Sequence, residues 1–368
     1  MHKRKSRFLT LAAVLLALQA VTLIAPAYAC GCGAMVTDRS SRMGVEKELS
    51  VVRWDGRTEQ IVMRFTVNGD APRAAWIMPV PTRATVELGD PDLFGDLARR
   101  TLPERKTRHY FWPREGDWPF STGTGDGAAA APMPGSGAPV GVVGREQLGD
   151  FDVARLTATD PDALRNWLTA NGFELPPGLA AELRPYVEQQ WEYVAVRLAP
   201  REPGRMLRGT LDPLRIRFAS DRLVYPMRLS RLARTPQALG LYVLADHRME
   251  PRDAIGGGTP EVTFAGRVEP EPSDPLAALT DGRPAYLTAV EQDFPRPAAI
   301  TGDHELVRTP ADTPFRRTTY TDALLTVGPG VPAWLLTVAS VLVAATAAAV
   351  TLRRRKTSRR AAGQGRPA

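Results

Sequence analysis

The sequence predicts an α+β fold rich in β-structure, with two or three short helices and one C-terminal transmembrane helix. Apolar and polar residues alternate in several short runs, as they do in half-buried strands. Short stretches behind Asp-Pro dipeptides carry apolar residues at helical spacing. The stretch from Val331 to Leu352 has no charge, and a helix of that length spans the ~30 Å hydrocarbon layer of a bilayer.

This last stretch predicts an anchor that the protein retains. Pro332 suits the first helical turn, where its missing N–H group costs nothing. Trp334 has the place of an interfacial aromatic residue. Three arginines and a lysine follow Leu352 directly. Because basic residues beside an apolar span stay in the cytoplasm, we expect a transmembrane helix at 331–352 and a basic cytoplasmic tail at 353–368.

The N-terminus predicts export. Residues 1–29 combine a basic start, an apolar run and the small-residue sequence Ala27-Tyr28-Ala29, which together are typical of a secretory signal peptide. Its removal would leave residues 30–327 as an extracytoplasmic domain. The chain is therefore predicted to be a single-pass protein of the cell membrane, with its large N-terminal domain outside.

The distribution of charge argues against a nucleic-acid partner. The formal net charge is +7, but 11 of the 47 basic residues lie in the signal peptide and the tail, which contain no acids. The remaining 36 basic residues face 40 acidic ones, so the exported part carries a charge of −4. Arginine outnumbers lysine amid much alanine, glycine and proline, which indicates a high-GC bacterial genome.

The two cysteines, Cys30 and Cys32, lie at the start of the expected mature chain. They could form a tight Cys-x-Cys disulfide, or Cys30 could be lipidated after the small residues that precede it. Ala27 stands where a lipidation signal usually has leucine. Two thiols alone make a poor zinc site, since zinc usually takes four ligands.

Strands are expected through most of the exported part. The β-prone runs Glu48–Trp54 and Gln60–Val67 flank Asp55-Gly56 and predict a hairpin. The run Ala74–Met78 predicts a strand that is ended by Pro79-Val80-Pro81, and we expect this proline segment to be an edge or an extended exit. Further strands are expected at Tyr193–Leu198, Leu214–Phe218, Leu223–Leu229, Leu241–Ala245 (in a central position) and Val262–Val268.

Three short helices and one insertion complete the predicted domain. Helices are expected from Asp90 to about Arg100, from Asp160 to Asn171, and from about Pro177 to Gln190. Residues 121–141 consist almost wholly of Gly, Ala, Pro, Ser and Thr, which predicts a flexible insertion.

Several segments resemble a known family. These are the CGCG start, AAWIMPVPTRA, DPDALRNWLTANGFELPP, LRIRFASDRLVYPMRLS and YLTAVEQDF. Together they resemble the bacterial domain of unknown function 2330 family over most of Cys30 to Leu325. The resemblance implies an actinobacterial source, secretion and a C-terminal membrane span. The family has no assigned reaction, so it implies no catalytic or binding residues.

The best candidates for binding are five aromatic residues beside the insertion, namely Tyr110, Phe111, Trp112, Trp118 and Phe120. Flat aromatic rings beside a mobile loop can stack on sugars or grip a peptide. Alternatively, these residues close the core where the insertion leaves it.

Candidates for chemistry are few. His109, His247 and His304 could form a three-histidine metal site if they met, whereas the alternative is three unrelated surface or cap histidines. Gly256-Gly257-Gly258 lacks the lysine of a phosphate loop and is read as a turn. Ser136, in the insertion, lacks the flanking pattern of a serine-hydrolase elbow. No cofactor is predicted.

Two classes of function follow. The absence of a recognised catalytic motif favours a non-enzymatic surface protein that binds, adheres or organises the envelope, with an envelope protein or a glycan as ligand. The alternative is an extracytoplasmic hydrolase with a site that the sequence does not show. Ser340, Ala344 and Ala348 place three small side chains on one face of the anchor, which predicts a weak homodimer through the membrane helix.

Overall fold

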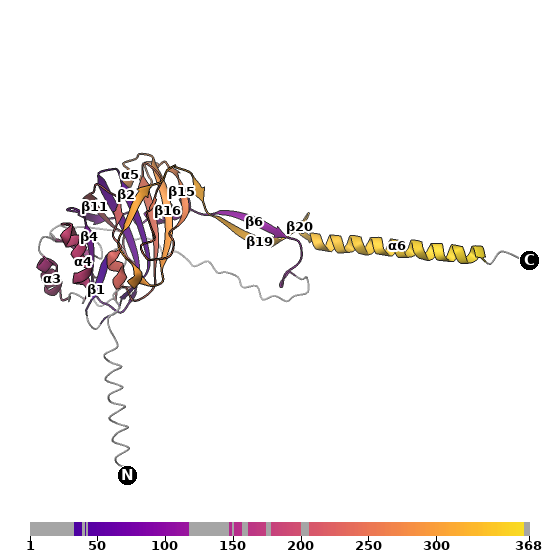
Figure 1. Cartoon of the computed structure of the whole chain (residues 1–368), viewed down its shortest axis with the longest axis horizontal. Helices are drawn as coiled ribbons and strands as arrows, with labels where there is room; N and C mark the ends of the chain where they lie inside the picture. The colour runs from indigo at the N-terminus through magenta and orange to yellow at the C-terminus, as the bar shows by residue number, and fades with distance from the viewer. Residues whose placement is uncertain are drawn as a thin grey trace, which may run out of the picture. The chain divides into compact units, whose positions relative to one another are not determined.

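The structure is a computed structural model of the 368-residue chain, shown in Figure 1. It describes residues 33–38, 41, 43–117, 147–148, 151–156, 161–173, 178–199 and 206–363. The described residues fall into two compact units. We call the first the body (residues within 1–103 and 140–317) and the second the ribbon–helix unit (residues within 104–139 and 318–368). The predicted β-rich α+β fold with a C-terminal apolar helix is confirmed.

The body contains a large sheet of nine strands. In spatial order these are β18 (Phe315–Arg316), β15 (Glu261–Val268), β16 (Ala285–Phe294), β13 (Gln237–Ala245), β2 (Met43–Trp54), β3 (Thr58–Gly69), β11 (Leu214–Ala219) and β5 (Thr85–Leu88), with β10 (Gly209–Thr210) also pairing with β3. β2 and β3 form the hairpin that Asp55-Gly56 predicts. β13 lies between β2 and β16, so its predicted central position is confirmed.

A second sheet of five strands faces the large one. In spatial order it contains β1 (Ala34–Thr37), β4 (Ala74–Val80), β9 (Glu192–Leu198), β8 (Phe151–Leu156) and β7 (Gln147–Leu148). β4 pairs with β9 along its length but with β1 only up to Ile77, so Pro79 and Val80 lie at an edge, in agreement with the expectation for the segment from Pro79 to Pro81. Pro79 is tolerated because β1 stops opposite Ile77, which leaves Pro79 with a partner on the β9 side only.

A small three-stranded sheet contributes side chains to the core between the two main sheets. Helices cover the outer faces of these two larger sheets. The small sheet contains β12 (Val224–Tyr225), β17 (His304–Arg308) and β14 (Met249–Pro251). The helices are α2 (Leu93–Arg100), α3 (Pro161–Ala170), α4 (Leu179–Glu188) and α5 (Ala277–Thr280), with 3-10 turns η1 (Arg228–Leu232) and η2 (Pro297–Ala299). The strand expected at Leu223–Leu229 is reduced to β12, because the chain turns into η1.

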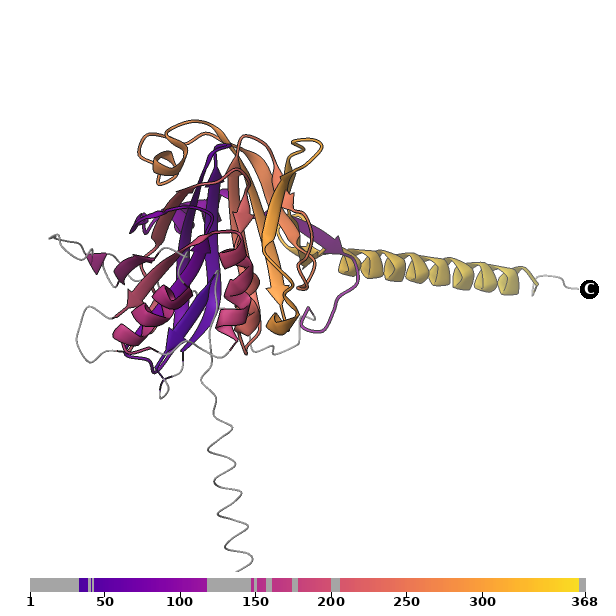
Figure 2. The ribbon, with the colours of Figure 1, turned by 60° about the vertical axis from the view of Figure 1, so that its left-hand side comes forward.

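Three apolar clusters divide the body into layers. The largest lies between the two main sheets and includes Trp76 of β4, Ile61 of β3 and Val243 of β13. A second joins the outer face of the five-stranded sheet to α3, α4 and η1 (Figure 2). The third joins the large sheet to α2 and α5. The body is thus two sheets packed face to face, with helices on both outer sides.

The ribbon–helix unit contains a two-stranded parallel ribbon and a long helix. Its elements are β6 (Glu104–Tyr110), β19 (Thr318–Leu324), β20 (Thr326–Val327), β21 (Val331–Pro332) and α6 (Ala333–Gly363). Within α6, residues Ala333–Lys356 have a mean hydropathy of 2.2 and are long and apolar enough to cross a membrane. Their most apolar 18-residue window is not buried within the protein.

Candidate functional site

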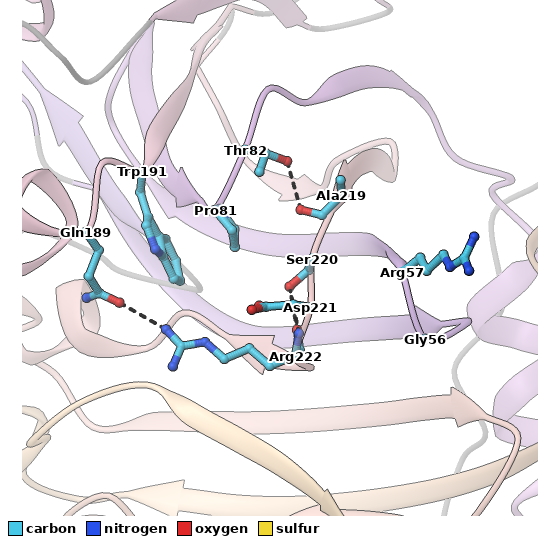
Figure 3. Close-up of a pocket in the computed structure, with 10 residues that line it drawn as sticks. All are labelled: Gly56, Arg57, Pro81, Thr82, Gln189, Trp191, Ala219, Ser220, Asp221 and Arg222. Atoms are coloured by element: carbon cyan, nitrogen blue, oxygen red, sulfur yellow. Dashed lines mark hydrogen bonds between the residues drawn. The ribbon is translucent and has the colours of Figure 1, made fainter.

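Four connections of the body surround a pocket with a volume of about 660 Å³ (Figure 3). They are the β2–β3 turn, the exit from β4, the corner between α4 and β9, and the loop between β11 and β12. The pocket is lined by Gly56, Arg57, Pro81, Thr82, Gln189, Trp191, Ala219, Ser220, Asp221 and Arg222. Because the flanking strands belong to both main sheets, the sandwich core holds these connections in place.

The corner after α4 is fixed by its helix cap. Gln190 adopts a left-handed conformation with φ of 59°, and its N–H group donates to the Val187 carbonyl at 3.0 Å. The Trp191 N–H group donates to the Tyr186 carbonyl at 2.9 Å. This pair of bonds is a Schellman motif, which turns the chain sharply out of the helix. It places Gln189 and Trp191 at the pocket, where Trp191 also packs against the Tyr186 ring with centroids 5.1 Å apart.

The loop after β11 supplies two of the charged groups of the pocket, Asp221 and Arg222. Arg222 donates to the Gln189 side-chain oxygen at 3.0 Å and to the Glu305 carboxylate at 3.4 Å. These two acceptors orient the guanidinium group. The side chain of Arg222 remains 50% exposed. Thr82 donates to the Ala219 carbonyl at 2.8 Å, which joins the exit from β4 to the same loop. Figure 3 shows the Arg222 guanidinium group turned toward Gln189 across the pocket.

The β2–β3 turn forms another wall. The Asp55 carboxylate accepts the N–H groups of Arg57 at 3.0 Å and Thr58 at 2.8 Å. Burial alone would raise the pKa of Asp55, but these two backbone donors and the nearby arginines lower it overall. The turn is therefore held by a charged carboxylate at neutral pH, and Ser220 is tied to it because its N–H group donates to the Arg57 carbonyl at 2.8 Å.

The pocket is equipped to bind polar groups. Asp221 is exposed, and it makes no hydrogen bond or ion pair within the part of the chain that the structure describes. The hydroxyl of Ser220 donates to the Arg222 carbonyl, so its proton is directed to the backbone. The Asp221 carboxylate, the oriented Arg222 guanidinium and the largely buried Trp191, which is 5% exposed, thus line one opening. Of these groups, the carboxylate can accept hydrogen bonds from ligand hydroxyls and the guanidinium can donate hydrogen bonds to them.

The predicted aromatic residues lie elsewhere. Tyr110, Phe111 and Trp112 belong to the ribbon–helix unit, while Trp118 and Phe120 lie outside the described residues. Tyr110 donates its hydroxyl to the Asp117 carboxylate at 2.7 Å, which raises the pKa of Tyr110 and lowers that of Asp117. Cys30, Cys32, the expected signal peptide and the insertion at 121–141 also lie outside the described residues.

The structure places the three predicted histidines in different settings. His109 is exposed on β6, and His247 pairs with the Asp312 carboxylate at 2.8 Å. His304 is 1% exposed, and neither ring nitrogen has a hydrogen-bond partner among the residues that the structure describes. Burial lowers the pKa of His304 to about 4, although Asp253 acts in the opposite direction. Among the described residues, no group of three or more His, Cys, Asp or Glu side chains could hold a metal ion.

The glycine triplet is a structural turn. Gly256 has φ of 86°, and a Cβ atom there would lie 1.9 Å from the Ala299 carbonyl oxygen. The Gln292 side chain donates to the carbonyls of Ala254 at 2.7 Å and Gly258 at 2.8 Å. Glycine is therefore needed for the close approach of two backbone segments, in agreement with the predicted turn.

Sequence reasoning missed the pocket. Its lining residues come from four segments that are far apart in the chain, and each segment alone looks like an ordinary polar turn. The one available signal is Trp191, a large aromatic residue directly after a helix stop and before a strand.

Fold and site together define a β-sandwich protein with a loop pocket and, in the part of the chain that the structure describes, one helix that could cross a membrane. The chain belongs to the family described as uncharacterized protein conserved in bacteria (DUF2330), whose profile matches residues 26–307. The resemblance seen in the sequence is thereby confirmed. The match contains the whole pocket and ends before β19 and α6.

Two further comparisons add little. None of the curated proteins matches the chain. The crystal structure of baculovirus P35 aligns with 72% of this chain and 95% of that chain, at 9% identity and a TM-score of 0.32. A likeness this weak carries no conclusion about this protein.

Proposed function

We propose that this protein is a non-enzymatic binding protein of the bacterial cell surface, anchored by α6, which captures an envelope glycan in the loop pocket of the body. The observation that carries the proposal is the oriented guanidinium group of Arg222 beside the exposed Asp221 and the ring of Trp191. A guanidinium group and a carboxylate together can donate and accept hydrogen bonds, which suits ligands with many hydroxyls. Two arginines and one aspartate line the pocket, which favours glycans that carry carboxylates.

The topology in this proposal rests on the sequence and on α6. The signal-peptide pattern of residues 1–29 and the basic residues after Leu352 support an orientation with residues 30–327 outside the cell and residues 353–368 in the cytoplasm. The apolar helix Ala333–Lys356 supplies the span between them. Such an arrangement exposes the pocket to polymers of the envelope.

Glycan binding by the full-length chain in lipid nanodiscs tests the proposal. The probe is an array of bacterial surface oligosaccharides, both neutral and uronate-bearing. We expect retention of one glycan class, with Arg222→Ala and Asp221→Ala each weakening binding by roughly 10- to 100-fold, because a charged hydrogen bond is worth about 1.5–3 kcal/mol.

Matched control variants distinguish binding in the pocket from a general effect of removing a surface charge. Arg283 and Glu87 are exposed residues of the body outside the pocket, so Arg283→Ala and Glu87→Ala should leave glycan retention unchanged. Equal losses from pocket and control variants would refute a site in this pocket. Retention of no glycan by the folded wild-type chain would refute the ligand class. Cleavage of a retained glycan would favour the hydrolase instead.

A further inference from the structure

One end of the ribbon in the ribbon–helix unit carries exposed apolar side chains. Trp112 is 63% exposed, Val327 52%, Val331 41% and Leu325 36%. Phe111 packs edge-on against Trp112, with ring centroids 5.1 Å apart. We call these five residues the apolar tip. Large apolar side chains gathered at one exposed place mark an interaction surface.

Backbone hydrogen bonds join the apolar tip to the first residue of α6. The Leu325 N–H group donates to the Tyr110 carbonyl at 2.8 Å, and the Ala333 N–H group donates to the Leu325 carbonyl at 2.8 Å. The two strands therefore end at the point where the helix begins. Ala333 and Trp334 are each 8% exposed, whereas residues 335–356 of α6 are exposed.

A layer of charged side chains lies next to the apolar tip. Arg108 and Arg114 both donate to the Asp322 carboxylate, each with one contact at 2.7 Å. These hydrogen bonds lower the pKa of Asp322 to about 2. Tyr110 is hydrogen-bonded through its backbone to Leu325 of the apolar tip. Arg108 precedes Tyr110 by two residues, or roughly 7 Å of strand. The headgroup region on each side of a bilayer is about 5–7 Å thick, so apolar and charged layers follow each other at membrane spacing.

We propose that the apolar tip inserts into the boundary between headgroups and acyl chains of the membrane that α6 crosses, with the charged layer at the headgroups. The partner is a phospholipid bilayer. Tryptophan favours this boundary, because its ring is apolar while its N–H group needs a polar partner. The inference rests on α6 as the span and is independent of ligand binding in the pocket. It gives Phe111 and Trp112 a lipid partner in place of a sugar.

Spin labels on the full-length chain in phosphatidylglycerol–phosphatidylcholine liposomes test this proposal. Cys30 and Cys32 are the only cysteines and are first replaced by serine. A single label is then attached at Trp112→Cys, at Lys106→Cys on the ribbon, or at Leu342→Cys within α6. Collision rates with oxygen, which concentrates in lipid, and with a water-soluble nickel chelate report the position of each label.

We expect the labels at 112 and 342 to give a similarly high oxygen-to-nickel collision ratio, as in lipid. The label at 106 should give the low ratio of a site in water. An aqueous ratio at 112 beside a lipid ratio at 342 would overturn the proposal and leave the anchor intact. Aqueous ratios at both positions would overturn the anchor as well. Glycan binding in the pocket is unaffected by either result.

A label at position 112 necessarily removes Trp112, the residue under test. A second set of variants avoids this problem. A label at Val327→Cys keeps Trp112 in place and should also report lipid. Adding Trp112→Ser should shift that label toward water. Tyr320→Ser is the matched control, since Tyr320 is 61% exposed on β19 but lies outside the apolar tip. An equal shift from both serine variants, or none from either, would overturn the role of Trp112.

Discussion

Strands of the body and strands of the ribbon–helix unit are stabilised in different ways. Every residue of β4 is buried, whereas six of the seven residues of β6 are exposed. The body therefore gains stability by removing apolar surface from water. The ribbon relies on its ladder of backbone hydrogen bonds and on ion pairs such as Arg108–Asp322. Exposed ion pairs contribute little, so we expect the ribbon to open at a lower free energy than the body.

The largest expected difference between the two units comes from truncating one aromatic side chain in each. Trp76 is completely buried between the two main sheets, and Trp76→Ala should lower the free energy of unfolding by about 3–5 kcal/mol. Tyr320 is 61% exposed, and Tyr320→Ala should change it by less than about 0.5 kcal/mol. Guanidinium unfolding of the full chain in detergent, followed by circular dichroism, measures both. Similar losses would contradict the contrast between the units.

A second difference concerns pH. His304 has a pKa of about 4 in the folded body, against 6.5 for an ordinary histidine. As the pH falls from 6.5 to 4, the unfolded chain takes up a proton that folded His304 does not. The contribution of this residue to stability is therefore fully present above 6.5 and falls by up to about 3 kcal/mol on acidification. Unfolding measured across this range should show a smaller loss on acidification for His304→Leu than for wild type.

Two variants serve as controls for this prediction. His109→Gln removes an exposed histidine of the ribbon and serves as a control for the loss of a histidine outside the body. Glu59 is completely buried, and burial raises its pKa well above 4.5 despite one backbone donor. Its contribution is therefore present at low pH and lost as the pH rises, so Glu59→Gln should have the opposite effect to His304→Leu. Parallel curves for wild type and His304→Leu would contradict the assignment.

The smallest expected effect is on the ribbon itself. Asp322→Asn removes the charge that Arg108 and Arg114 share, and should speed amide exchange in β6 and β19 without altering exchange in β13 or β16. Asp281→Asn is the control, because Asp281 pairs with Arg283 on the surface of the body. Hydrogen-exchange mass spectrometry in nanodiscs measures all four strands. Unchanged exchange in the ribbon would mean that its backbone ladder alone sustains it.

The same contrast explains how much of the fold the sequence could predict. The hairpin at Asp55-Gly56 and the central strand β13 were predictable because buried strands carry apolar residues in a recognisable pattern. The sequence of β6, ERKTRHY, has no such apolar pattern, and its partner β19 lies more than 200 residues further along the chain. A strand without a buried face cannot be recognised from periodicity.

The candidate site was less predictable than the fold. Pairing between distant segments brings Arg57, Gln189, Trp191 and Arg222 to one opening, and no local pattern encodes that pairing. The aromatic residues beside the insertion were recognisable as a group. Their neighbours were not, because the hydrogen bonds from Tyr110 through Leu325 to Ala333 join residues far apart in the sequence.

The proposed function requires the body to lie outside the cell, where the pocket would be accessible to envelope polymers. Protease treatment of intact protoplasts that carry the full chain, with an epitope tag after Ala368, tests this orientation most directly. We expect the body to be digested while a fragment with α6 and the tag survives. Loss of the tag with survival of the body would place the pocket in the cytoplasm and contradict the proposed function.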